Sequence, residues 1–243
     1  MNVVPETTGV RGPGTGHRED GPEEAGRPGT SVSSEPGART SEPGLARIAV
    51  LLSGRGSNFV ALADACARGD IPAEIAVVVS NRADAAGLDR ARERGIHAMA
   101  ILAKGLVREE HEAKVIAAVE GAGAEWICLA GYMRLLSEHF IARFPQRIVN
   151  IHPALLPSFP GLDAQRQAWE YGVKLSGCTV HLVDAGCDSG PIVLQRAVAV
   201  LDDDSADTLA ARILEQEHIA YPTALRWLLT RGWRLEGRRV VFD

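Results

Sequence analysis

A continuous run of five apolar residues, from Ile48 to Leu52, constrains the fold of this chain more than any other feature of its sequence. Apolar and polar side chains do not alternate within the run, and Ser53 and Gly54 follow it directly. Strands of this kind are buried on both faces, and such strands belong to parallel sheets that helices cover. The run therefore predicts a central strand of an α/β domain.

The segments that follow alternate between strand and helix patterns. Short apolar segments indicate strands, and segments with apolar residues at helical spacing indicate helices. This alternation is typical of successive βαβ units, so we expect a doubly wound, mostly parallel sheet. The predicted strands are 48–52, 74–79, 97–102, 126–130 and 147–151, and the predicted helices between them are 59–67, 85–94 and 108–120.

The pattern changes after residue 151. Three prolines between residues 152 and 160 indicate an ordered loop, because each proline restricts its own backbone and removes a hydrogen-bond donor. Two later strands are long enough to add an antiparallel C-terminal edge to the sheet. The expected elements are a helix at 164–171, strands at 177–183 and 192–200, a long helix at 206–231 and a hairpin at 233–242.

The first 45 residues differ in composition from the rest of the chain. They hold 9 of the 25 glycines and 6 of the 13 prolines, but only six larger apolar side chains. Ordering the backbone costs ~1–2 kcal/mol per residue, which so few apolar groups do not offset. The sequence thus predicts a disordered tail at 1–45 and one folded domain at 46–243.

Charge and hydropathy exclude several classes of function. The net charge is −5 and no basic run is present, so nucleic acid is not an expected partner. No apolar stretch approaches the ~18 residues of a membrane span, and the N-terminus lacks the apolar stretch of a signal peptide, so we expect a cytoplasmic protein. The cysteine spacing fits neither a zinc site nor a disulfide framework and predicts reduced thiols at Cys66, Cys128, Cys178 and Cys187.

The turn after the first strand reads Ser53-Gly54-Arg55-Gly56-Ser57-Asn58. Small residues let the backbone approach a ligand, and the free amides at the start of the next helix, with the positive end of its dipole, suit a phosphate. The turn lacks the ending of a Walker loop and the third glycine of a dinucleotide fingerprint. An ordinary helix start, capped at Ser57 or Asn58, is the alternative interpretation.

The segment from Asn150 to Pro157 begins at the carboxyl end of the fifth predicted strand, where open α/β sheets bind ligands. Side chains alternate along a strand, so Asn150 and His152 project from the same side. An amide donor beside an imidazole suits stabilisation of a developing oxyanion and proton transfer. The alternative is a polar pair that only ends the strand.

A loop rich in turn-forming residues, from Asp184 to Pro191, connects the two later strands. Asp188 in this loop, if it lies near His152, would raise the pKa of the histidine and keep the ring protonated. The alternative is a carboxylate that only shapes the turn. The loop has no calcium-type spacing of acidic residues, so we expect no metal.

The segment from Met133 to Leu136, also after a strand, is either part of an apolar ligand site or the start of a helix. The other histidines are expected at structural positions: His17 in the tail, His97, His111 and His139 at the surface or at strand ends, and His181 within a strand.

The order and spacing of five motifs resemble those of the 10-formyltetrahydrofolate-dependent formyltransferases. The Asn-Ile-His-Pro segment is common to that whole family, and the Gly-x-Gly-Ser-Asn turn is similar to that of the phosphoribosylglycinamide formyltransferases within it. The resemblance extends from about Arg47 to Asp243. The motifs are Gly54–Asn58, Ala130–Arg134, Asn150–Pro157, Asp188–Pro191 and Gln216–His218.

The resemblance implies a formyltransferase-type, Rossmann-like fold and a reaction of de novo purine synthesis. In that reaction, the formyl group of the co-substrate 10-formyltetrahydrofolate moves to the amine of 5′-phosphoribosylglycinamide, without a metal or a covalent enzyme intermediate. We expect small-molecule partners only, and a monomer or a homodimer. By the same resemblance, the catalytic residues are Asn150, His152 and Asp188, the substrate-binding residues are Gly56, Ser57, Asn58 and Glu217, and the folate-binding residues are Arg108, Met133, Arg134, Leu135, Leu136 and Asn150.

In the implied mechanism, Asn150 and a protonated His152 stabilise the tetrahedral oxyanion. Asp188 orients His152 and organises a water that carries a proton from the amine to N10 of the folate. The loop at 161–165 departs from the family pattern, because it lacks the histidines that some members carry there.

Three other functions remain open from the sequence. Methionyl-tRNA formyltransferases share the Asn150 to Pro157 segment but carry a further C-terminal domain, and formyltetrahydrofolate hydrolases carry an N-terminal regulatory domain. The third is a non-catalytic module that binds phosphate at the Gly54 to Asn58 turn. Folate release from 10-formyltetrahydrofolate, with and without phosphoribosylglycinamide, distinguishes these functions.

Overall fold

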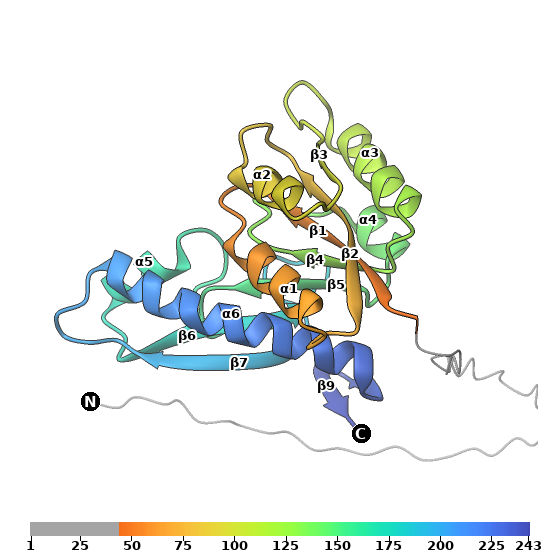
Figure 1. The fold of residues 1–243 in the computed structure, drawn as a ribbon. Helices are drawn as coiled ribbons and strands as arrows, with labels where there is room; N and C mark the ends of the chain where they lie inside the picture. Colours follow the sequence, from red (N-terminus) through yellow and green to blue (C-terminus); the bar gives the residue numbers. More distant parts are fainter. Residues whose placement is uncertain (1–43) are drawn as a thin grey trace, which may run out of the picture. The chain divides into compact units, whose positions relative to one another are not determined.

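The structure, a computed structural model, describes residues 44–243. Of the predicted disordered tail, residues 1–45, only Gly44 and Leu45 are among the described residues. His17 also lies outside them. The first strand begins at Ala46, and Figure 1 shows the elements that follow.

One sheet forms the centre of the described part of the chain. Its strands are β1 (Ala46–Leu52), β2 (Ala73–Ser80), β3 (Ala98–Ala100), β4 (Trp126–Leu129), β5 (Ile148–His152), β6 (Leu175–Leu182), β7 (Ile192–Ala199), β8 (Trp233–Glu236) and β9 (Arg239–Phe242). They lie in the order β3-β2-β1-β4-β5-β6-β7-β9-β8. Strands β1 to β5 pair in parallel, whereas β5, β6 and β7 pair antiparallel. The predicted α/β fold with a mostly parallel sheet is confirmed.

The C-terminal side of the sheet differs in one respect from the prediction. Strands β6 and β7 are antiparallel, as expected, but they do not form the edge. The hairpin of β8 and β9 continues the sheet, because β9 pairs in parallel with β7 through Ile192 and Arg239. The hairpin thus covers one end of an edge strand whose backbone groups would otherwise remain unpaired.

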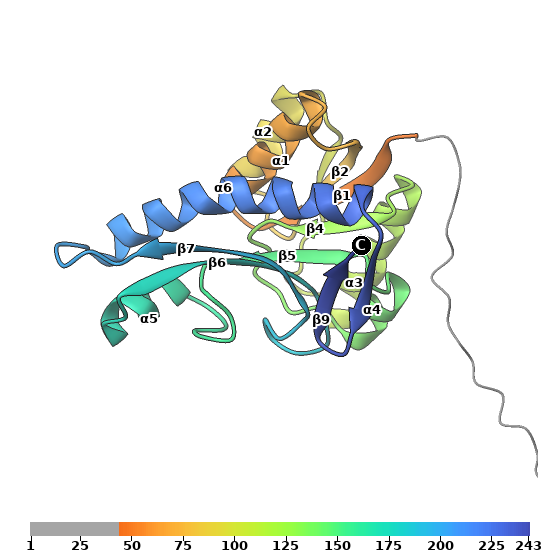
Figure 2. The same ribbon diagram turned by 90° about the horizontal axis from the view of Figure 1, so that it is seen from below.

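Helices cover both faces of the sheet. Alternate residues of β1 explain this arrangement: Ile48 and Val50 pack in a cluster with α1, α2 and α6, whereas Ala49 and Leu51 pack with α3 and α4. Figure 2 shows α1 and α6 on one side of the strands and α3 and α4 on the other. The helices are α1 (Ser57–Ala67), α2 (Ala86–Glu93), α3 (Arg108–Gly121), α4 (Glu138–Arg143), α5 (Ala164–Tyr171) and α6 (Ala206–Thr230).

Helix α4 begins two residues after Met133–Leu136, a segment for which a helix start was one of two interpretations. This helix has only 6 residues, which is too short for a periodic apolar pattern. Its start is defined locally, because the Ser137 Oγ accepts a hydrogen bond from the Phe140 amide at 3.1 Å. The fully buried Phe140 ring then holds the helix against the sheet.

Helix α6 is attached to the two strands that end at the candidate site. The hydroxyl of Tyr221, which is fully buried, lies 3.0 Å from the carbonyl oxygen of Leu129 in β4 and 2.9 Å from that of Val149 in β5. The single hydroxyl proton is shared between these two acceptors. Tyr221 therefore sets the position of α6 relative to the ends of both strands.

His111 corrects one expectation. It was expected at the surface or at a strand end, but its ring is fully buried on the inner side of α3, and Nε2 lies 2.9 Å from the Ile101 carbonyl oxygen. Burial lowers its pKa below the ordinary value of 6.5. The available signal was its spacing, because His111 precedes the buried Val115 by one helical turn.

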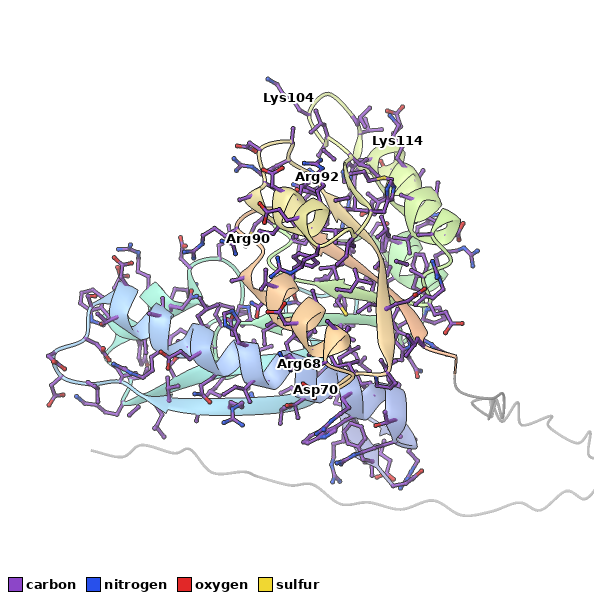
Figure 3. All side chains as sticks on the ribbon, viewed as in Figure 1. Arg68, Asp70, Arg90, Arg92, Lys104 and Lys114 are labelled. Carbon is purple, nitrogen blue, oxygen red and sulfur yellow. The ribbon has the colours of Figure 1, made fainter. Side chains whose placement is uncertain are left out.

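The outer surfaces of α2 and α3 are charged. Figure 3 shows Arg90 and Arg92 of α2 and Lys114 of α3 extending away from the sheet. Arg92 pairs with Asp89 at 2.7 Å, and exposed pairs of this kind contribute at most ~1 kcal/mol. Within residues 44–243, no helix is both long and apolar enough to cross a membrane.

Candidate active site

A cavity of about 980 Å³ lies at the carboxyl ends of the parallel strands. Its walls come from the turn after β1, the segments after β4 and β5, the loop between β6 and β7, and one side of α6. Ligands of open α/β sheets bind at this edge. Every site residue predicted from the sequence except Arg108 lines the cavity: Gly56, Ser57, Asn58, Met133, Arg134, Leu135, Leu136, Asn150, His152, Asp188 and Glu217.

The turn after β1 forms one end of the cavity. Gly56 has a φ of +74°, and a Cβ atom at this position would lie 2.7 Å from Gly87 Cα, so the position requires glycine. The expected alternative, a side-chain cap at Ser57 or Asn58, is wrong, because Gly56 is the N-cap residue and no side chain caps the helix. The amides in the first turn of α1 therefore remain available to an anion.

A buried polar pair lies beside this turn. The Asn58 Nδ2 atom donates to Oε2 of Glu217 in α6 at 2.7 Å. Burial raises the pKa of Glu217, and the hydrogen bond from Asn58 opposes that rise. The Asn58 Oδ1 atom is buried and has no hydrogen-bond partner within residues 44–243. Because buried polar atoms are normally paired, this end of the cavity suits a ligand that carries hydrogen-bonding groups.

The three predicted catalytic residues meet in the middle of the cavity. Strand β5 places Asn150 and His152 on the same side, and Asp188 reaches them from the loop between β6 and β7. The Asp188 Oδ2 atom lies 3.2 Å from His152 Nδ1, and Asn150 Nδ2 donates to Asp188 Oδ1 at 3.3 Å. The Asp188 side chain is 14% exposed, so these contacts are largely shielded from solvent.

The shape of the β6–β7 loop aims Asp188 at β5. Asp188 itself has a φ of +50°, which non-glycine residues seldom adopt. Asp184 supports this conformation, because its Oδ1 atom accepts hydrogen bonds from the Gly186 amide at 3.1 Å and from the Ser189 hydroxyl at 2.6 Å. The turn-forming role that the sequence offered as an alternative thus belongs to Asp184.

His181 is a fourth member of the cluster, which the sequence analysis missed. Strand register places it opposite Asn150. Its Nδ1 atom donates to the Leu182 carbonyl oxygen at 2.9 Å, which leaves Nε2 to accept a hydrogen bond from Asn150 Nδ2 at 3.1 Å. His181 alternates with apolar residues along its strand, and this pattern does not show which residue of another strand it contacts. Only the pairing of β5 with β6 reveals the contact with Asn150.

Asp188 is ionised in this environment. Burial by itself would raise its pKa, but the His181 ring, the Gly161 amide and the His152 ring together lower it to about 2. The carboxylate is therefore a permanent negative charge beside His152.

The predicted effect of Asp188 on the pKa of His152 is present, but it does not set the net shift. Asp188 does raise the pKa of His152, as expected, and so does the hydrogen bond with the Phe159 carbonyl. Burial acts in the opposite direction and outweighs both, so the net pKa of His152 lies below the ordinary 6.5. Both ring nitrogens nevertheless face acceptors, because Nδ1 lies 3.2 Å from Asp188 Oδ2 and Nε2 lies 2.8 Å from the Phe159 carbonyl oxygen.

The loop after β5 closes on the same cluster. The Phe159 carbonyl oxygen lies 2.8 Å from His152 Nε2, and the Gly161 amide donates to Asp188 Oδ2 at 2.8 Å. Backbone atoms of this loop thus occupy hydrogen-bonding positions of both side chains. A ligand that binds His152 Nε2 must displace the Phe159 carbonyl.

An apolar wall, residues 133–136, forms another side of the cavity. The side chains of Met133 and Leu135 are 63% and 65% exposed. Arg108 lies outside the cavity lining and donates from Nη2 to the Leu135 carbonyl oxygen at 2.8 Å. In this structure, Arg108 supports the wall from behind.

Comparison with known proteins identifies relatives of this chain. The family described as formyl transferase matches residues 46–225. The trifunctional purine biosynthetic protein adenosine-3 of Drosophila melanogaster is 48% identical over 187 residues, which are 75% of this chain and 14% of that protein. The phosphoribosylglycinamide formyltransferase of Escherichia coli is 42% identical over 181 residues, which are 74% of this chain and 85% of that protein. The chain thus spans a small part of the first relative and most of the second.

A solved structure has the same fold. Glycinamide ribonucleotide transformylase 1 from Symbiobacterium toebii superposes with a TM-score of 0.81 at 47% sequence identity. The match covers 85% of this chain and 98% of that one.

Proposed function

The chain belongs to the formyl transferase family, and we propose that it transfers the formyl group of 10-formyltetrahydrofolate to the amine of 5′-phosphoribosylglycinamide in de novo purine synthesis. The names of the relatives in Escherichia coli and Symbiobacterium toebii support this substrate. One observation carries the proposal: a single cavity contains an uncapped helix start, a largely buried Asn-His-Asp cluster and an apolar wall.

The turn end of the cavity suits the phosphoribosyl part of the substrate. The amides of Gly56, Ser57 and Asn58 would hold the phosphate, since an uncapped helix N-terminus attracts anions. The Glu217 carboxyl would then accept hydrogen bonds from the ribose hydroxyls, next to the unpaired Oδ1 of Asn58. This arrangement directs the amine of the substrate toward His152.

The apolar wall suits the folate. Met133, Leu135 and Leu136 would contact the flat pterin ring, and Arg134 and Asn150 complete that side of the cavity. Arg108, which is partly exposed behind the wall, would reach the acidic tail of the folate only from outside the cavity. The formyl group then lies between the turn and the wall, beside Asn150 and His152.

The proposed chemistry is direct acyl transfer. The amine nitrogen attacks the formyl carbon, a new C–N bond forms, and the carbonyl electron pair moves onto the oxygen. Asn150 Nδ2 stabilises this oxyanion by exchanging its longer hydrogen bond, 3.3 Å to Asp188, for one to the oxygen. Cleavage of the bond to N10 restores the carbonyl and releases tetrahydrofolate.

His152 handles the proton that the amine loses. Once the ligand displaces the Phe159 carbonyl, the Asp188 carboxylate favours the tautomer with the proton on Nδ1, which leaves Nε2 as a base. The neutral ring accepts the proton from the attacking nitrogen, and Asp188 stabilises the imidazolium that forms. The proton then passes to N10, so the enzyme returns to its starting state.

An absorbance assay that follows release of tetrahydrofolate tests the proposal. We expect release from 10-formyltetrahydrofolate only when phosphoribosylglycinamide is present, together with a formylated product detected by mass spectrometry. Release without that substrate would indicate a hydrolase instead. No release with either mixture, but formylation of methionyl-tRNA, would indicate the tRNA enzyme, and folate or phosphate binding without any turnover would indicate a binding module.

A further inference from the structure

Glu112 is a buried carboxylate that the proposed chemistry does not use. It lies in α3, is 4% exposed and does not line the cavity. A buried carboxylate is costly unless it is hydrogen-bonded. The Glu112 Oε1 atom accepts from the Ser137 amide at 2.9 Å and lies 3.3 Å from Arg108 Nε, and its Oε2 atom accepts from the Ser137 hydroxyl. All three contacts come from two residues next to the apolar wall.

Both partners of Glu112 hold the wall in place. Arg108 donates to the carbonyl oxygen of Leu135, and Ser137 is the first residue after the wall. Ser137 also caps α4 through its bond with the Phe140 amide, which fixes its own position. One carboxylate therefore connects α3 to the middle of the wall and to its C-terminal end.

Side-chain packing does not fix the position of Met133 and Leu135 in the wall. The Met133 and Leu135 side chains are mostly exposed, so the course of the backbone depends on polar contacts. At the N-terminal end, the Ser53 hydroxyl accepts a hydrogen bond from the Met133 amide at 2.8 Å. At the other end, Glu112 supplies the corresponding anchor.

We propose that Glu112 is a positioning residue for the apolar wall, and that it sets the affinity of the site for the folate co-substrate through Arg108 and Ser137. This inference rests on the proposed function, because the wall is assigned there to the pterin ring. It adds a residue that touches no ligand and yet determines the shape of one half of the site.

Glu112→Gln is the sharpest test, since it keeps the size and shape of the side chain. The substitution turns one of the two acceptor oxygens into an NH2 donor, which then faces either the Ser137 amide or the Ser137 hydroxyl, and it removes the negative charge beside Arg108. We expect KM for 10-formyltetrahydrofolate to rise ~10-fold, while kcat and KM for phosphoribosylglycinamide stay within about twofold of the wild type.

The matched control is Glu120→Gln. Glu120 lies in the same helix and also pairs with an arginine, Arg143, at 2.5 Å, but this pair is exposed and includes no residue of the wall. We expect this variant to have wild-type kinetic constants. A purely structural role of Glu112 would instead lower kcat and change both KM values together, and that outcome would overturn the inference.

A binding measurement removes the dependence on turnover. Calorimetric titration of the full chain with tetrahydrofolate should show a Kd raised ~10-fold in Glu112→Gln, whereas ribose 5-phosphate should bind both proteins equally. An unchanged Kd for tetrahydrofolate overturns the inference. If the wild type binds tetrahydrofolate but transfers no formyl group, the proposed reaction fails, and the Kd shift still decides the role of Glu112.

Ser137→Ala keeps the test decisive if Glu112→Gln does not fold. It removes the hydroxyl that donates to Glu112 Oε2 and that also caps α4, and it leaves the backbone amide in place. We expect a smaller rise of ~3-fold in the same two folate constants. Wild-type folate constants in a folded Ser137→Ala protein would contradict the proposed anchor.

Discussion

At the turn end of the cavity, the groups proposed to bind the phosphoribosyl ligand come mostly from one continuous segment, Gly54 to Asn58, and most of them are backbone amides, with Glu217 of α6 beside them. The proposed catalytic cluster draws its side chains from three separate places: β5, the end of β6 and the loop after it. The turn end therefore depends on the path of the backbone, whereas the cluster depends on the identity of side chains. Substitutions at the two places should consequently change different kinetic constants.

His152→Ala should produce the largest effect and should act on turnover. The variant loses the group that accepts the proton of the amine, so we expect kcat to fall by ~10²-fold or more, with smaller changes in both KM values. Steady-state kinetics measures this difference. His139→Ala, which changes an exposed histidine of α4, is the control and should keep wild-type turnover. Near-normal kcat in His152→Ala would remove His152 from the chemistry.

Gly56→Ala should produce the next largest effect and should act on substrate binding. The new Cβ atom would lie 2.7 Å from Gly87 Cα in a backbone with φ of +74°, so the turn must shift. We expect KM for phosphoribosylglycinamide to rise by at least ~10-fold, with kcat at saturation changed less.

Gly69→Ala separates backbone strain from lost binding in that experiment. Gly69 has a φ of +77°, but a Cβ atom there meets nothing within 4 Å. This control should lose ~1 kcal/mol of stability in urea denaturation and keep the wild-type KM. If Gly69→Ala raises KM as much as Gly56→Ala does, the effect at Gly56 reflects general backbone strain and not lost binding at the turn.

The pH dependence of the wild type examines the cluster without a substitution. Burial lowers the pKa of His152 below 6.5, and the proposed base is the neutral ring. We therefore expect kcat/KM to be constant near pH 7 to 8 and to fall, by up to tenfold per unit, as the pH drops through that pKa. A decline on the alkaline side of the same pKa would show that the protonated ring is the active form.

The smallest expected effect is on stability and concerns His111, which lies outside the cavity. Its pKa in the folded protein is lowered by burial, so the unfolded chain binds more protons as the pH falls. The stability that His111 contributes is fully present above its unfolded pKa of about 6.5 and decreases as the pH falls toward the folded pKa. Urea denaturation at pH 7 and pH 5 should show a smaller loss for His111→Gln than for the wild type, with equal activity at pH 7. Identical losses in the two proteins would contradict this role.

Local patterns were sufficient for much of the fold. The predicted strand at 74–79 and helix at 164–171 correspond to β2 (Ala73–Ser80) and α5 (Ala164–Tyr171), because apolar periodicity reports burial directly. The bounds of the short α4 were not predicted, since its start depends on one capping serine and its stability on one buried ring. The parallel contact between β7 and β9 was also not predicted, because it joins residues far apart in the chain.

For the site, the sequence by itself determined which groups are available: a glycine-rich turn before a helix, an Asn-x-His pair at a strand end, and an aspartate in a later loop. Only the tertiary structure decided how they act. Burial reversed the expected shift of the His152 pKa, strand register brought His181 to Asn150, and helix packing placed Glu112 behind the apolar wall. The physical reason is that desolvation and hydrogen bonding depend on every neighbour in space, whereas sequence patterns report only neighbours along the chain.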